Sequence, residues 1–220
     1  LNDQLREAYH ASIADAWATR SGASEGDVEA LDGELCVALC DHYLKGARGA
    51  DALRYLDRAL TQLEEGYVNE QAIRLGQRAL EVPGLLEGSA RAAILLRLVV
   101  RYDLIGDREA QRASCEEALA LAREHGDPKR ECRALESLAT MFRMQGLFEE
   151  ATTWSERHLA LSQASGDTRG IAEATMALGS IRMTTGAPDE GRAFLEEALE
   201  FYRTAGDRRG MAKAHGNLGA

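Results

Sequence analysis

The chain has 220 residues, of which 45% are hydrophobic and 28% charged, and its formal net charge is −10. This composition excludes a disordered chain, and no apolar run approaches the roughly 20 residues that cross a bilayer. The N-terminus lacks the zones of a signal peptide. An acidic surface without a basic stripe disfavours nucleic acid. We therefore expect a cytoplasmic protein without a nucleic-acid or membrane partner. Arginine outnumbers lysine 23 to 3, which favours a bacterial source.

The first predicted element is a helix near the N-terminus. Leu5, Tyr9, Ile13 and Trp17 recur every four residues, so they share one face of a helix. The segment RSGASEGD at 20–27 has the composition of a loop. We predict that this helix docks on the first repeat of the chain through its apolar stripe and acts as a lid.

The segment from 50 to 82 has an irregular rhythm. Two stretches, ADALRYLDRALTQLEEG and VNEQAIRLGQRALE, both have the pattern of the second helix of a helical pair. One helix could therefore serve two overlapping repeats. The stretch EVPGLLEGS at 81–89 then separates this block from a regular array.

The regular array has a period of forty residues. Two series of turn glycines mark it, Gly126, Gly166 and Gly206, each followed by Asp, and Gly106, Gly146 and Gly186. Two turns in each period imply two helices per repeat. Glycine tolerates the left-handed conformation that ends a helix, and Asp accepts hydrogen bonds from the free N–H groups of the next helix. Pro128 stands at a first helical position, where its missing donor has no cost.

Between the turns, apolar and small residues recur forty residues apart. In the first helix of each pair, a leucine column adjoins a column of smaller residues: Leu98, Leu138, Leu178 and Leu218, then Val99, Ala139, Gly179 and Gly219. In the second helix, Leu119, Leu159 and Leu199 follow Ala118, His158 and Ala198. These columns predict the seam at which the helices approach closely.

These positions resemble the tetratricopeptide repeat, in which large, small and aromatic residues stand at fixed intervals. The matching residues are Leu39, Cys40, Tyr43, Ala52, Leu56, Ala59, Phe142 and Ala151. Departures occur at Arg182, Gln111, Gly191 and His158. The period exceeds the usual 34 residues, so each helix should be longer by about three residues. Repeats of this length resemble those of LGN/Pins-type scaffolds and of bacterial regulators.

The resemblance covers roughly 33–220 and implies an all-α fold, a right-handed superhelical solenoid of antiparallel helix pairs. We expect a capping helix and irregular helices at 1–88, three regular repeats at 89–207, and the first helix of a truncated further repeat at 208–220. Because the chain begins with Leu1 and ends inside a repeat, we expect it to be part of a longer parent.

No catalytic, cofactor or metal motif is found, neither a phosphate-binding loop nor H-E-x-x-H, G-x-S-x-G or C-x-x-C. Cys36 and Cys40 share a helix face, but His42 lies about 240° around the helix from Cys36, so the three cannot meet at one metal. With Cys115 and Cys132, they are expected to be reduced thiols in the core. We predict no catalytic residue, no cofactor and no metal ligand.

The resemblance implies that the first helix of each pair lines a concave groove. The inward positions are Ala93, Leu96, Val100, Asp103, Arg133, Glu136, Thr140, Arg143, Glu173, Met176, Ser180 and Met183. Such a lining suits an amphipathic segment, or an extended peptide with acidic side chains near Arg133 and Arg143. In the alternative interpretation, Leu96 and Met176 merely pack between repeats. The lysines and asparagines of the carboxylate-clamp class are absent as a set.

The sequence favours a non-enzymatic protein-interaction scaffold whose partner is a protein or peptide segment, or another domain of the same parent. The block before residue 89 is similar to the region that follows the nucleotide-binding module in STAND-type ATPase regulators and kinase-linked relatives. That resemblance implies the sensor arm of a bacterial signalling protein. A free-standing peptide-sensing adaptor is the alternative, and an enzyme that uses the groove is a third.

Overall fold

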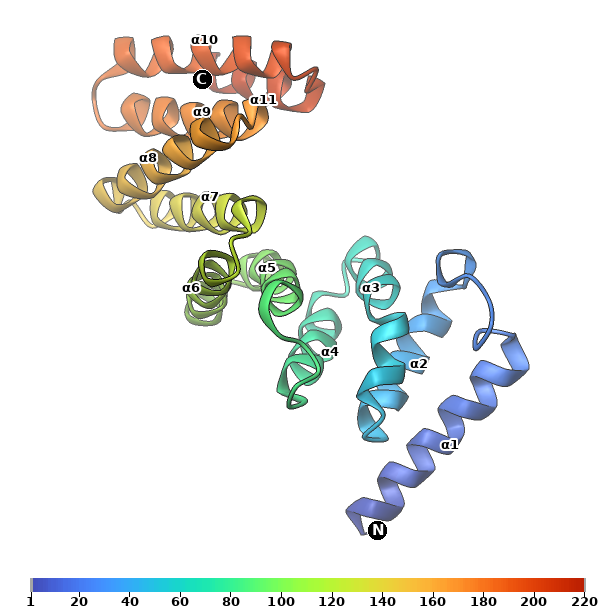
Figure 1. Ribbon diagram of the computed structural model, residues 1–220. Helices are drawn as coiled ribbons and strands as arrows, with labels where there is room; N and C mark the ends of the chain where they lie inside the picture. Colours follow the sequence, from blue (N-terminus) through green and yellow to red (C-terminus); the bar gives the residue numbers. More distant parts are fainter. Residues whose placement is uncertain (1, 220) are drawn as a thin grey trace. The chain divides into compact units, whose positions relative to one another are not determined.

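The computed structural model describes residues 2–219, which form eleven α-helices and one short 3-10 helix, with no strand (Figure 1). The predicted all-α fold of helical pairs is therefore confirmed. No helix within 2–219 is both long and apolar enough to cross a membrane. The chain divides into two compact units, unit 1 (Leu1–Gln111) and unit 2 (Arg112–Ala220). The predicted division at residue 88 rests on sequence periodicity and stays a prediction, as does the right-handed superhelical turn.

Short turns connect the helices. Unit 1 contains α1 (Asp3–Ser21), the 3-10 helix Val28–Ala30, α2 (Gly33–Lys45), α3 (Gly49–Glu65), α4 (Asn69–Glu81) and α5 (Gly88–Ile105). Helix α6 (Arg108–Glu124) begins in unit 1 and continues into unit 2. Unit 2 continues with α7 (Pro128–Met144), α8 (Phe148–Ser165), α9 (Thr168–Thr184), α10 (Pro188–Thr204) and α11 (Arg208–Leu218).

The Gly-Asp turns end one helix and begin the next, as predicted. Their glycines, Gly126, Gly166 and Gly206, have φ values of 60°, 69° and 68°. Each following aspartate accepts a hydrogen bond from a backbone N–H three residues later, over 3.1 Å at Asp127 and Asp167 and 2.9 Å at Asp207. These hydrogen bonds satisfy backbone N–H groups that have no partner within the first turn of a helix.

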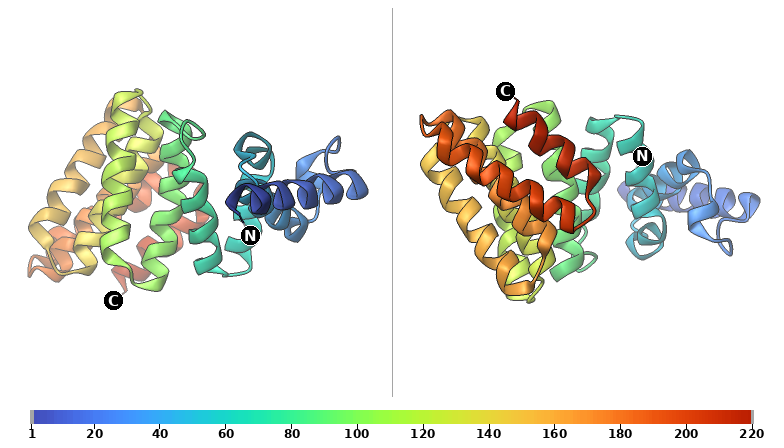
Figure 2. Two further views of the ribbon diagram at one scale, coloured as in Figure 1. Left: turned by 90° about the horizontal axis from the view of Figure 1, so that it is seen from below. Right: turned by 90° about the horizontal axis from the view of Figure 1, so that it is seen from above.

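Successive helices of unit 2 pack against one another from α7 to α11, and the right view of Figure 2 shows α11 in dark red beside α10. Most of the predicted seam is buried: Leu138, Leu178, Leu199 and Ala198 are 8% exposed or less. Leu159 and Leu218 are only half-buried. Helix α11 packs on α9 and α10. Its assignment to a further repeat at 208–220 stays a prediction, and Ala220 lies outside the described residues.

Helices α9 and α10 approach each other at two glycines. A Cβ added to Gly191 would lie 2.7 Å from the backbone nitrogen of Met183 and 2.9 Å from the carbonyl oxygen of Gly179. A Cβ on Gly179 would lie 3.0 Å from the carbonyl oxygen of Gly191. Backbone therefore packs on backbone here, which explains why Gly191 replaces the alanine typical of the repeat.

Helix α1 docks on α2, but through a different face from the predicted one. Its buried residues are Ala14 and Ala18, whereas Leu5, Tyr9 and Trp17 are 57%, 65% and 40% exposed. The reason is the close approach of the helices, since small alanines allow it and aromatic rings would hold the helices apart. Leu5 and Tyr9 of the predicted stripe consequently face outward, whereas Ile13 is half-buried and the partly exposed Trp17 ring still meets His42 of α2.

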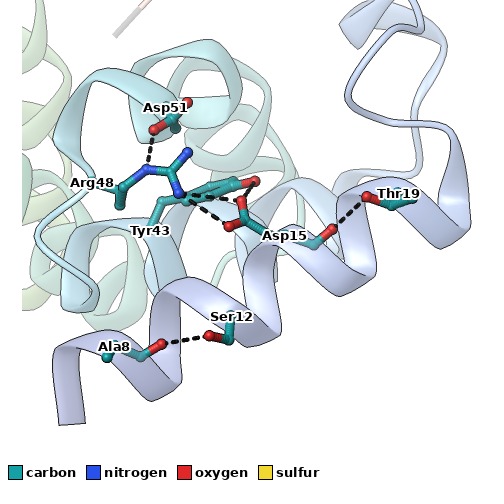
Figure 3. Close-up of polar contacts among 7 residues, drawn as sticks. All are labelled: Ala8, Ser12, Asp15, Thr19, Tyr43, Arg48 and Asp51. Carbon is teal, nitrogen blue, oxygen red and sulfur yellow. Dashed lines mark hydrogen bonds and ion pairs between the residues drawn. The ribbon is translucent and has the colours of Figure 1, made fainter. Parts of the chain in front are cut away.

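A polar cluster fixes α1 in place (Figure 3). The Tyr43 hydroxyl donates a hydrogen bond to Asp15 over 3.1 Å, and Arg48 pairs with the same carboxylate at 3.1 Å. Arg48 also pairs with Asp51 at 2.6 Å. Burial and the bond to Asp15 raise the pKa of Tyr43 to about 12, so its hydroxyl stays a donor at neutral pH.

All four cysteines are buried and unpaired, as predicted. Burial raises the pKa of Cys40 and of Cys115 to about 12 and also raises the pKa of Cys36 and Cys132. A thiol that stays protonated at neutral pH is a poor nucleophile, so these residues act as small packing groups.

Candidate functional site in unit 2

Helices α7 and α9 carry the eight positions that were predicted to line the groove in this unit. Arg133, Glu136, Thr140 and Arg143 stand at helical spacing on α7. The spacing recurs forty residues later on α9 with Glu173, Met176, Ser180 and Met183. Residues spaced by three or four lie on one face of a helix, so each set forms a continuous strip.

Seven of these eight residues line one hollow of about 410 Å³, here called the unit 2 hollow. Its lining consists of Glu136, Ala139, Thr140, Arg143, Ser155, His158, Glu173, Met176, Ala177, Ser180, Met183, Thr184 and Asn217. Arg133 lines an adjoining hollow of about 350 Å³ together with Glu136, His158 and Glu173. A volume of this size lies within the range of ligand pockets.

The four predicted positions on α5 belong to unit 1. Leu96 is 2% exposed and therefore offers almost no surface to a ligand, whereas Val100 is 43% exposed. Ala93 is half-buried. Asp103 is exposed but pairs with Arg108 and accepts a hydrogen bond from Gln111 at 3.3 Å. Only Val100 presents a free, exposed side chain among the four.

Two arginines, Arg143 at the unit 2 hollow and Arg133 at the adjoining hollow, have no ion-pair partner among the described residues. Arg133 is exposed and Arg143 half-buried, and they stand ten residues apart on the same face of α7. Most other arginines of unit 2 are paired, for example Arg169 with Glu173 at 3.0 Å. Unpaired guanidinium groups beside a hollow are suited to carboxylates, which they can bind through two parallel hydrogen bonds.

Glu136 lies between these arginines along α7, and its carboxyl group has a raised pKa. Burial, together with the neighbouring carboxylate of Glu173, raises the pKa of Glu136 to about 7. Its side chain is half-buried and has no ion pair within residues 2–219. Near neutral pH this carboxyl group can therefore donate a hydrogen bond or carry a charge, according to its surroundings.

Helix α8 supplies a polar floor to the hollow. Ser155 and His158 are fully or almost fully buried, at 0% and 2% exposed. The Ser155 hydroxyl donates to the carbonyl oxygen of Ala151 over 2.8 Å, which occupies it within its own helix. Burial lowers the pKa of His158, so the imidazole is neutral at pH 7. These groups favour a polar ligand and do not form an activated nucleophile.

We predict that Glu136→Gln stabilises the protein at about pH 8 and has little effect at about pH 5. The raised pKa means that the charged carboxylate is disfavoured in the folded state. Below the pKa that Glu136 has in the unfolded chain, the group is protonated and its contribution to the free energy of unfolding is at its highest. This contribution falls as the pH rises towards the folded-state pKa of about 7, because the folded protein must then hold a charged carboxylate. Urea unfolding at both pH values should show a gain of about 1 to 3 kcal/mol at the higher pH only.

Glu196→Gln is the matched control, because Glu196 is exposed on α10. It should shift stability by less than about 0.5 kcal/mol at both pH values. If Glu136→Gln changed the free energy of unfolding equally at the two pH values, the raised pKa of the half-buried Glu136 would be contradicted.

Sequence periodicity did not predict all of the lining. Ser155, His158 and Asn217 come from α8 and α11, which were not expected to face the groove. The Asn217 amide donates to the Ser180 hydroxyl over 3.1 Å, so α11 closes one side of the hollow. The one signal in the sequence was His158, a large polar residue in a column otherwise occupied by alanine.

No protein-family model matches the chain, and no curated protein matches it in sequence. Solved structures are similar to it in fold. Aspartyl phosphate phosphatase F from Bacillus subtilis has a TM-score of 0.63 at 13% sequence identity, over 83% of this chain and 55% of that one. BtubC (BKLC) from P. vanneervenii has a TM-score of 0.61 at 16% identity, over 94% of this chain and 93% of that one.

A third similar structure is a Signal Transduction ATPase with Numerous Domains (STAND) protein with a tetratricopeptide repeat sensor, from Pyrococcus horikoshii. Its TM-score is 0.52 at 18% identity, over 86% of this chain and 37% of that one. The chain thus spans about half the length of the phosphatase and about a third of the STAND protein. At these identities the likeness shows the helical-repeat fold alone.

Proposed function

We propose that the chain is a non-enzymatic protein-interaction module and that the unit 2 hollow binds a protein or peptide segment with acidic side chains. One observation carries the proposal: Arg143 at the unit 2 hollow and Arg133 at the adjoining hollow have no ion pair within the described residues. Two carboxylates of an extended segment could pair with these arginines, while the polar floor around His158 accepts the backbone or a polar side chain.

The similar structures support an interaction role by analogy of fold. One of them is a protein with a tetratricopeptide repeat sensor, and the predicted resemblance of this chain is to the same repeat. The buried Ser155 and the protonated thiols support the absence of catalysis, because neither offers an activated nucleophile. The buried reduced cysteines also suit the cytoplasm.

Selection of random dodecapeptides by phage display on the full chain tests the proposal. The selected peptides should be enriched in Asp and Glu, and their affinity should fall with rising salt. Arg133→Glu/Arg143→Glu should weaken binding by about a hundredfold, because attraction becomes repulsion at two positions. Fluorescence anisotropy with a labelled peptide would measure the loss.

The matched control is Arg192→Glu/Arg203→Glu on α10, two exposed arginines that are not part of the hollow. This variant has the same net charge as the groove variant and should retain most of the affinity. Equal losses in both variants would mean that net charge, rather than the hollow, determines binding. Selection of peptides without acidic residues would contradict the proposed chemistry.

The parent context has two candidates. We favour a regulatory arm of a larger bacterial signalling protein, because the block before residue 89 resembles the region after the nucleotide-binding module of STAND-type regulators. The alternative is a free-standing adaptor that senses a peptide. A Walker motif in the flanking gene sequence would support the first, and a complete short reading frame with a helix-turn-helix would support the second.

A further inference from the structure

Unit 1 contains a second hollow, of about 520 Å³, on the exposed face of α2. Glu34, Val37, Ala38 and Asp41 line it at positions i, i+3, i+4 and i+7 of that helix. Trp17 of α1 forms another part of the lining. The spacing on α2 is that of a helix face into which the side chains of another helix can pack, and Ala38 leaves room for a close backbone.

Large apolar side chains at this hollow remain in contact with solvent. Trp17 is 40% exposed and Val68, in the turn before α4, is 44% exposed. Tyr9 and Leu5, nearer the start of α1, are also exposed but do not line the hollow. An apolar surface of this kind, bordered by polar groups, is typical of a protein interaction site.

The position of Trp17 is fixed by contacts between α1 and α2. Its ring meets the ring of His42 edge-on, with centroids 5.2 Å apart. His10 and His42 face each other with their Nδ1 atoms at 2.8 Å, and Asp15 is held by Tyr43 (Figure 3). The indole is therefore part of a built surface and does not depend on a mobile helix.

The charged residues that line the hollow itself are acidic, whereas the adjoining hollow that shares Val37 and Asp41 is lined by Lys45, Arg74 and Arg78. The lining of the larger hollow contains Glu34 and Asp41 and no lysine or arginine. Asp41 is already paired with Lys45 and Arg78, whereas Glu34 is exposed and has no ion pair within the described residues. Unit 1 as a whole carries nineteen acidic and twelve basic side chains. A cationic partner is attracted to such a surface, and an anionic partner is repelled.

We propose that this hollow of unit 1 binds a basic amphipathic helix from a partner protein. The apolar face of that helix would pack on Val37, Ala38 and Trp17, and a lysine or arginine beside that face would pair with Glu34. This site is separate from the unit 2 hollow and selects the opposite charge. One chain could accordingly bind an acidic segment through unit 2 and a basic helix through unit 1.

Trp17 provides a direct readout in the full chain. With Trp154→Phe, the chain keeps Trp17 as its single tryptophan, and a Leu/Lys amphipathic peptide of about four helical turns serves as the probe. Saturable binding should shift the Trp17 emission to the blue, because the indole leaves water. A Leu/Glu peptide of the same length should cause no shift.

Two substitutions locate the site. Glu34→Lys should lower the affinity for the Leu/Lys peptide by about fivefold or more. Glu196→Lys, the same charge change at an exposed position of α10 in unit 2, should leave the affinity within about twofold of the original. Val37→Asp should abolish the emission shift, and circular dichroism should show an unchanged helical content. Equal losses for both lysine variants, an unchanged affinity in Glu34→Lys, or absence of a Trp17 response would overturn the proposal.

Discussion

Gly191→Ala is expected to destabilise the protein by about 2 to 3 kcal/mol, measured by urea unfolding. A methyl group at this position would lie 2.7 Å from the backbone nitrogen of Met183 and 2.9 Å from the carbonyl oxygen of Gly179. A flexible side chain could move away, but these atoms belong to the backbone of α9. Helices α9 and α10 must therefore separate, and each loses buried contacts along its length.

Gly216→Ala is the matched control, since Gly216 also lies inside a helix but has no atom within 4 Å of an added Cβ. Here the substitution should stabilise the protein by about 0.5 to 1 kcal/mol, because alanine has the better helix propensity. If both variants were equally stable, the close backbone contact at Gly191 would be ruled out as the reason for glycine there.

Arg97→Met should cost about 2 to 4 kcal/mol of stability in unit 1. Arg97 on α5 donates two hydrogen bonds of 2.9 Å to the carboxylate of Glu64 on α3, and one of 2.6 Å to Asp57. Arg97 is only 17% exposed and Glu64 24% exposed. Methionine fills part of the space but leaves the Glu64 carboxylate without its partner in a poorly hydrated place.

The double variant Arg97→Met/Glu64→Leu separates lost pairing from lost packing. Removal of both charges should restore more than half of the stability that Arg97→Met loses, because no unpaired carboxylate remains. Arg6→Met is the surface control: its ion pair with Asp3 has both side chains more than half exposed, so its loss should change stability by less than about 0.5 kcal/mol. A double variant as unstable as Arg97→Met would refute the explanation.

The sequence predicted the fold through features that act locally. Gly166 has a left-handed backbone, and the carboxylate of Asp167 caps the next helix, as predicted. Both features depend on a few consecutive residues only. The register of forty residues then aligned Glu136 with Met176, and both line the same hollow. Helical period is enough to decide which side chains share a face.

Features that depend on helix–helix distances were not predictable. The stripe with Trp17 appeared to be the docking face of α1, but Ala14 and Ala18 allow the closer approach and are buried instead. In unit 2, the hollow is also lined by His158 of α8 and Asn217 of α11. Which residues of a helix reach a neighbouring hollow depends on the angle at which helices cross. Such angles depend on several side chains from helices far apart in sequence.

Photocrosslinking from the unit 2 hollow tests the central claim most directly. Benzoylphenylalanine would replace either Thr140, which lines the hollow, or Glu196, which is exposed on α10, and each protein would be irradiated with a selected acidic peptide. We predict adducts from position 140 that disappear in Arg133→Glu/Arg143→Glu, and none from position 196. Adducts from position 196 alone, or equally from both positions, would contradict binding in the hollow.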